Sequence, residues 1–178
     1  MSPEPFLGAT EHTPVSHHIL SVLVENKAGV LSRVAGLFSR RGFNIYSLAV
    51  APADETERFS RLTIVVDAES APLEQIIGQL DKLINVVEIS DLAPVEAVER
   101  ELLLATVPVS DNDRGELLRS VAHAGAAIID FSENAVTISL SGTPAAIDAF
   151  EAGLAEQYPS REVQRTGRVA LSRLDRAR

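Results

Sequence analysis

Apolar positions recur from residue 18 onward in an order typical of alternating strands and helices. The mostly apolar run 18–24 predicts a buried strand, and residues 44–50, 59–67 and 86–92 predict three more. Two apolar stripes at helical spacing fall between these strands. They comprise Val30, Leu31, Val34, Leu37 and Phe38 in one, and Leu73, Ile76, Ile77, Leu80, Leu83 and Ile84 in the other. Gly42 is the expected stop of the first helix, and Ser70 with Pro72 opens the second.

The same order of elements recurs after residue 100. Residues 102–109, 126–131 and 161–164 predict strands, and a further strand alternates apolar residues at Val136, Ile138 and Leu140. Pro108 belongs at a strand end, because proline cannot donate to a sheet. The first predicted helix of this half has an apolar stripe of Leu117, Leu118, Val121 and Ala122 and stops at Gly125. The second begins after a Thr143 cap and has an apolar stripe of Ile147, Phe150 and Leu154. We therefore predict an α+β chain of two ferredoxin-like βαββαβ domains in tandem.

These patterns suggest a division of the chain into four parts. Residues 1–16 are expected to form a disordered tail, residues 17–92 the first domain, and residues 101–178 the second. Residues 93–100 show no strand alternation and contain Pro94, so we interpret them as a linker. The end of the second domain, 161–178, carries six arginines against Glu162 and Asp175, and is either a solvated tail or a docking patch for an acidic partner.

Composition excludes several classes of protein and compartment. The 178 residues are 46% hydrophobic, as in soluble globular domains, and contain no cysteine, so disulfides and thiolate metal sites are absent. The first 16 residues contain no lysine or arginine and no apolar run, so they do not resemble a secretory signal. No apolar stretch approaches the length of a membrane span. We therefore expect no membrane association and a cytoplasmic location.

Motifs for catalysis, metal binding and nucleic-acid binding are missing. The four histidines show no metal-ligand spacing, and neither a nucleophile elbow nor a phosphate-binding glycine loop occurs. RNA-recognition domains share the βαββαβ order but stack bases on strand aromatics, whereas the matching strands here offer only Phe59. A net charge of −9 further disfavours phosphate contacts. We expect no catalytic residue, no metal and no nucleic-acid partner.

One loop has candidate binding chemistry, the segment ENKAGVLSRV over 25–34. Asn26 is expected to cap the following helix through its side-chain oxygen, and Gly29 allows close approach of another group. The first amides of a helix have no partners within the helix and carry partial positive charge, which suits a carboxylate. A plain capped helix start explains the same residues, so this pattern alone leaves both interpretations open.

A resemblance to a known family adds to this interpretation. Residues 19–52 and the segments SRLTI (60–64), LEQIIGQLDKLINVVEISDL (73–92) and VEREL (98–102) closely resemble the regulatory, small subunit of acetolactate synthase, whose first domain is an ACT domain. The second half resembles it more thinly, through IIDF (128–131), AAIDAF (145–150) and RTGRVALSR (165–173). The resemblance covers nearly the whole chain after the tail.

The resemblance implies a regulatory role without catalysis. Such subunits bind and activate a catalytic large subunit, which would hold the thiamine diphosphate, magnesium and FAD, and they confer feedback inhibition by valine in branched-chain amino-acid synthesis. ACT domains pair side by side as a homodimer, with the amino acid at the interface. The positions carried over are a loop from one protomer and a strand start from the other, namely Asn26, Ala28, Gly29, Val30 and Leu31 with Asn44 and Ile45.

Two other functions remain open at this stage. ACT-type domains are reused widely, so a stand-alone amino-acid sensor acting on a different enzyme or regulator is one alternative. A small enzyme on a ferredoxin-like scaffold is the other, although the missing catalytic motifs disfavour it. Valine, leucine and isoleucine are not separated by sequence, because a methylene changes pocket affinity by only about 1–3 kcal/mol.

Overall fold

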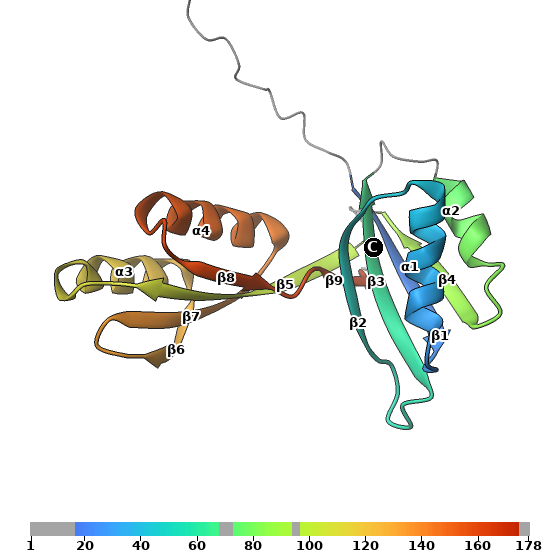
Figure 1. The fold of residues 1–178 in the computed structure, drawn as a ribbon, viewed down its shortest axis with the longest axis horizontal. Coiled ribbons are helices and arrows are strands. Elements are labelled where there is room, and N and C mark those ends of the chain that lie inside the picture. Colours follow the sequence, from blue (N-terminus) through green and yellow to red (C-terminus); the bar gives the residue numbers. More distant parts are fainter. Residues whose placement is uncertain (1–16, 68–72, 94–96, 175–178) are drawn as a thin grey trace, which may run out of the picture.

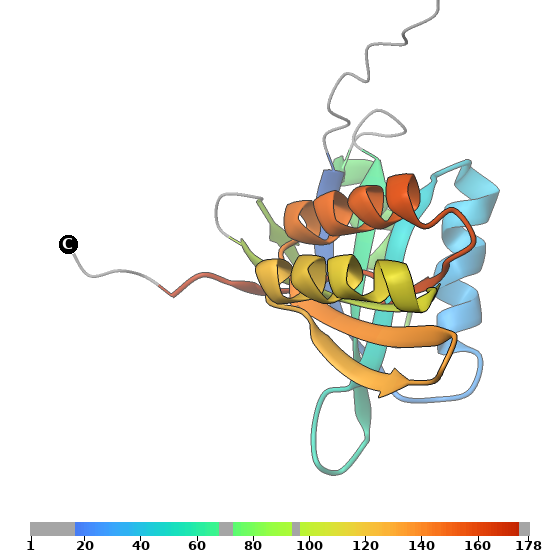
Figure 2. The same cartoon turned by 90° about the vertical axis from the view of Figure 1, so that its left-hand side faces the viewer.

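The computed structural model describes residues 17–67, 73–93 and 97–174, so the predicted tail over 1–16 lies outside the described residues. Two antiparallel sheets follow one another along the molecule, and each carries two helices on one face (Figure 1). Turned by 90°, the second domain lies in front of the first (Figure 2), so the two domains are arranged end to end. The predicted α+β fold with two βαββαβ units is confirmed.

The first domain is built from four strands and two helices. They are β1 (His17–Glu25), α1 (Val30–Arg41), β2 (Ile45–Pro52), β3 (Phe59–Asp67), α2 (Leu73–Leu80) and β4 (Val86–Leu92), with the sheet order β2-β3-β1-β4. The predicted stripes bury Val34, Leu37 and Phe38 against alternate residues of β1 and β3. Gly42 ends α1 in the left-handed conformation, with its amide donating to the α1 carboxyl end.

The predicted second helix of this domain is too long at its end. α2 stops at Leu80, and Ile84 is 90% exposed instead of extending the apolar stripe. The amide of Leu83 donates to the carbonyl of Leu80, so the chain leaves the helix in a turn before β4. The predicted opening of this helix at Ser70 and Pro72 lies outside the described residues.

The second domain repeats the arrangement with β5 (Ala97–Pro108), α3 (Asp111–Ala124), β6 (Ala127–Phe131), β7 (Ala135–Gly142), α4 (Pro144–Gln157) and β8 (Glu162–Arg165), in the sheet order β6-β7-β5-β8. Pro108 ends β5, and Gly125 ends α3, as predicted. The Thr143 cap is also confirmed, because its hydroxyl accepts from the amide of Ala146 at 3.3 Å.

The predicted linker over 93–100 is wrong for residues 97–100, which begin β5. They pair with an additional strand, β9 (Val169–Ser172), and the resulting two-stranded ribbon covers the helix-free face of the first sheet (Figure 1). Ala97 and Ala170 are buried there against Ile19, Val65 and Leu92. These small side chains allow the ribbon to pack closely on the first sheet. Because β5 runs without interruption from this ribbon into the second sheet, it connects the two domains. Residues 94–96 lie outside the described residues.

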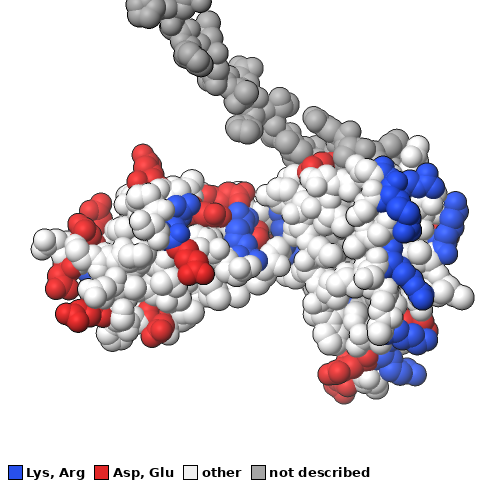
Figure 3. All heavy atoms as spheres, in the orientation of Figure 1, with Lys and Arg blue, Asp and Glu red and all other residues white. Residues whose placement is uncertain are grey.

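Two arginines of the arginine-rich end, Arg165 and Arg168, belong neither to a solvated tail nor to an open basic patch, whereas Arg173 is exposed. Arg165 pairs with acidic side chains of the second domain, and Arg168 lies between the domains with its side chain only 12% exposed. On the face shown in Figure 3, lysines and arginines gather over the helix side of the first domain, and acidic residues over the far end of the second. Arg176 and Arg178 lie outside the described residues.

Candidate functional site

The loop between β1 and α1 has a defined conformation held by long-range bonds. Gly29 is the N-cap of α1 and adopts a left-handed backbone with φ of 83°. The predicted cap by Asn26 is wrong: its side-chain amide donates to the carbonyl of Glu57 at 2.8 Å, and its backbone amide donates to the carbonyl of Arg58. Asn26 therefore fastens the loop to the turn between β2 and β3, because the left-handed Gly29 takes the cap position.

The candidate loop residues divide between surface and core. Asn26, Ala28 and Gly29 are exposed, and Leu31 is 44% exposed, whereas the Val30 side chain is buried in the first core. The amide of Val30 donates to the carbonyl of Lys27 at 3.2 Å. No bond is made by the amides of Leu31 and Ser32 to any described residue. The loop therefore presents free amides at a helix start, next to a partly exposed leucine.

The charged side chains beside this loop neutralise one another. Lys27 Nζ lies 3.0 Å from a carboxylate oxygen of Glu25. Hydrogen bonds from Lys27 and then from Asn85 hold the pKa of Glu25 below its ordinary value, so this carboxylate is charged at neutral pH. Lys27 is thereby occupied within the loop. An incoming carboxylate would depend on the backbone amides and the helix dipole.

Asn85, which no sequence motif indicated, supports the loop through hydrogen bonds to Glu25 and Arg33. Its backbone carbonyl accepts from the Glu25 amide at 2.9 Å, its side-chain amide donates to the Glu25 carboxylate, and its side-chain oxygen accepts from Arg33 at 2.6 Å. Asn85 is 8% exposed and joins the end of β1 to the first turn of α1. The signal was a lone polar residue inside the apolar run before β4.

We expect Asn85→Ala to loosen the loop. Removing a buried side chain that makes two hydrogen bonds to charged groups costs about 1–3 kcal/mol. Thermal unfolding followed by circular dichroism should show a lowered midpoint, and Asn112→Ala, an exposed change on α3, should leave it in place. Equal midpoints for the two variants would contradict the supporting role.

The other candidate residues lie at the opposite end of the sheet. The side-chain amide of Asn44 donates to Asp67 at 2.7 Å, and Ile45 pairs with Val66 and packs against the first core. Asp67 is opposite His17, whereas Phe59 is opposite Glu25 beside the loop. At about 3.3 Å per residue, eight steps along β3 separate the two groups by roughly 26 Å. One chain therefore does not bring them together.

The part of the chain that the structure describes has neither a candidate metal site nor a candidate membrane-spanning helix. No three or more histidine, aspartate or glutamate side chains lie there in an arrangement that could hold a metal ion. No helix within residues 17–67, 73–93 and 97–174 combines the length and apolar character needed to cross a membrane.

The chain matches two family models in succession. Residues 20–88 match the ACT domain of acetolactate synthase small subunits, and residues 100–174 match a model described as the small subunit of acetolactate synthase. The two matches fall on the first and second domains of the fold.

Individual relatives agree with these models. The chain is 48% identical to the acetolactate synthase small subunit of Mycolicibacterium smegmatis, over 88% of this chain and 91% of the relative. It is 44% identical to the small subunit of acetolactate synthase isozyme 3 of Escherichia coli, over 89% of this chain and 96% of the relative. The crystal structure of the small subunit from Thermotoga maritima superposes with a TM-score of 0.82 at 38% identity, over 90% of this chain and 99% of that chain. The relatives carry the name of the small subunit and not of the catalytic subunit, and this chain belongs to the family of acetolactate synthase small subunits.

Proposed function

We propose that this chain binds the catalytic large subunit of acetolactate synthase, raises its activity and makes it sensitive to inhibition by valine. The observation that carries the proposal is the separation of the two halves of the candidate site. The loop at Gly29 and the strand start at Asn44 lie at opposite ends of one sheet, and β2 is an edge strand. A homodimer formed through the first domain brings the loop of one protomer to the strand start of its partner.

The chemistry of both halves suits an amino acid. The free amides of Leu31 and Ser32 donate to the ligand carboxylate at the α1 start. Asn26 uses its amide nitrogen on Glu57, which leaves its side-chain oxygen to accept from the ligand ammonium group. Leu31, at 44% exposure, supplies an apolar surface for a small aliphatic side chain, and Ile45 supplies another from the partner protomer.

Inhibition requires that valine bind more tightly to the inhibited arrangement of the complex than to the active one. Moving a population from 1:99 to 99:1 takes about 5.5 kcal/mol, which two interface sites can share at a little under 3 kcal/mol each. By reciprocity, valine also changes the affinity of this chain for the catalytic subunit wherever the two states differ in that contact.

A titration of acetolactate formation with valine tests the proposal. We expect the rate to rise on adding this chain to the catalytic subunit and then to fall with valine, while the catalytic subunit alone keeps its rate. Parallel titrations with leucine and isoleucine measure selectivity, where a difference of about 10–200-fold is the most that one methylene provides. A stand-alone sensor would neither activate the catalytic subunit nor purify with it.

A further inference from the structure

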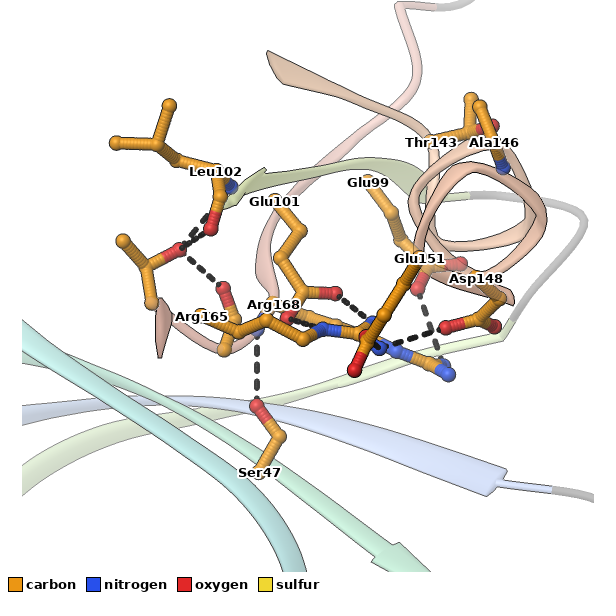
Figure 4. Close-up of polar contacts among 12 residues, drawn as sticks. Ser47, Glu99, Glu101, Leu102, Thr143, Ala146, Asp148, Glu151, Arg165 and Arg168 are labelled. Carbon is orange, nitrogen blue, oxygen red and sulfur yellow. Dashed lines mark hydrogen bonds and ion pairs between the residues drawn. The ribbon is translucent and has the colours of Figure 1, made fainter. Parts of the chain in front are cut away.

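The start of β2 is held from the second domain at a junction formed by Tyr46, Ser47, Glu99, Gly167 and Arg168. The backbone amide of Arg168 donates to the hydroxyl of Ser47 at 2.9 Å (Figure 4). Gly167 has a φ of 79°, and a Cβ at this position would lie 2.6 Å from the Ser47 hydroxyl oxygen. The backbone of the second domain therefore approaches β2 as closely as atoms allow.

Tyr46 makes the second contact because it is the extra residue of a β-bulge. Ile45 pairs with Val66 and Ser47 with the adjacent Val65, which leaves Tyr46 without a partner on β3. Its ring lies 4.3 Å from the ring of His17, and the Arg168 guanidinium lies 5.1 Å from its centroid, within the range of a cation–π interaction.

The cation in this junction is largely buried and paired. Arg168 Nη1 lies 3.5 Å from a carboxylate oxygen of Glu99, and the two side chains are 12% and 18% exposed. Burial weakens the solvent screening of both the ion pair and the cation–π contact. Glu99 belongs to β5 and Arg168 immediately precedes β9, so this pair lies where the β5–β9 ribbon begins.

The second-domain side of the junction is firmly anchored. The amide of Thr166 donates to the carbonyl of Leu102, and the Thr166 hydroxyl accepts from the amide of Leu102. The neighbouring Arg165 reaches Glu101, Asp148 and Glu151 on β5 and α4 (Figure 4). A displacement of the segment 165–168 would break these bonds, so the junction transmits the position of the second domain to β2.

On the β2 side, the same contacts lie directly beside the candidate site. Asn44 and Ile45 immediately precede Tyr46 and Ser47 in the chain. Asn44 also donates to Asp67, and Asp67 Oδ1 lies 3.3 Å from Nδ1 of His17, the residue that stacks on Tyr46. The strand start and the interdomain junction are thus one connected set of contacts.

We infer that Ser47 and Arg168 are positioning residues, through which the second domain holds the start of β2 in the place that effector binding requires. This inference rests on the proposed valine site and adds residues that do not touch the ligand. A cleft of about 450 Å³ lies beside the junction and is lined in part by Tyr46, Ser47, Arg165 and Gly167. By thermodynamic linkage, valine binding stabilises the contacts of Ser47 and Arg168, and these contacts in turn strengthen valine binding.

Calorimetry of valine binding to the free full-length protein tests the inference, with Ser47→Ala and Arg168→Met as variants. We expect at least fivefold weaker valine binding in each, with activation of the catalytic subunit retained in the absence of valine. Arg168→Lys, which keeps the cation, should bind valine within threefold of the unchanged protein. Arg173→Met, an exposed change a few residues further on, should bind valine normally.

The outcomes separate this inference from the proposed function. If the unchanged protein does not bind valine, the proposed function fails. If it binds valine, and Ser47→Ala and Arg168→Met bind equally well, the positioning role is wrong while the site stands. Thermal unfolding of each variant is the remaining measurement. If the unfolding midpoint falls in proportion to the loss of valine affinity, and activation of the catalytic subunit is lost as well, the role of these residues is purely structural and the inference is wrong.

Discussion

We expect Gly29→Asp to make the complex insensitive to valine while leaving activation of the catalytic subunit in place. The added carboxylate lies at the free amides of the α1 start and repels the carboxylate of the ligand. Two like charges about 4 Å apart repel by about 4 kcal/mol at an effective dielectric constant near 20. Even half of this energy weakens binding about 30-fold, so calorimetry should show an affinity reduced by at least that factor.

The structure indicates that this variant folds. A Cβ at Gly29 meets no atom within 4 Å, so the side chain has open space, and the cost is the φ of 83°. Aspartate and asparagine are among the non-glycine residues that adopt this left-handed region most often. Gly29→Asn has the same shape and backbone cost without the charge, and serves as the matched control. Unchanged valine affinity in Gly29→Asp would place the effector elsewhere.

Local periodicity predicted most of the fold correctly. The helical stripe correctly identified Val34, Leu37 and Phe38 as core, and the alternation in the second domain correctly identified Val136 and Ile138. Both patterns arise within a few residues, because helices repeat every 3.6 residues and strands every two. Glycine helix stops are equally local, since they require only a left-handed residue at the end of an apolar stripe.

Pairings between distant residues were not predictable in the same way. Ala97 pairs with Ser172, and the ribbon they belong to buries small residues that form no apolar stripe. Asn26 bonds to Glu57, 31 residues away, so nothing near Asn26 in the chain distinguishes this bond from a helix cap. The candidate loop was identified by resemblance and by glycine chemistry. Its support from Asn85 depends on strands that meet only in the folded chain.

The charge of the arginine-rich end was similarly misleading. Counted along the chain, residues 161–178 are basic, but Arg165 is surrounded by acids from β5 and α4. Its guanidinium lies 2.8 and 2.7 Å from the two oxygens of Glu101, 2.8 Å from Asp148 and 3.0 Å from Glu151. Hydrogen bonding to Glu101 raises the pKa of Arg165 above its ordinary value, which favours the charged guanidinium.

Arg165→Met should therefore destabilise the second domain severely. Glu101 has a side chain only 4% exposed, and without Arg165 its carboxylate is left buried and uncompensated beside two further acids. Removing one partner of a buried ion pair costs about 3–5 kcal/mol, and urea unfolding followed by circular dichroism should show a loss of this size. The exposed Arg173→Met is the control, with an expected change within about 0.5 kcal/mol.

A second variant separates the charge from the loss of packing. Adding Glu101→Gln to Arg165→Met removes the uncompensated carboxylate, so the double variant should recover more than half of the lost stability. If Arg165→Met unfolds at the same urea concentration as Arg173→Met, the ion pairs of Arg165 contribute nothing to the stability of the second domain. Anchoring of the segment 165–168 would then have to come from the hydrogen bonds that the Thr166 amide and hydroxyl make with the backbone of Leu102.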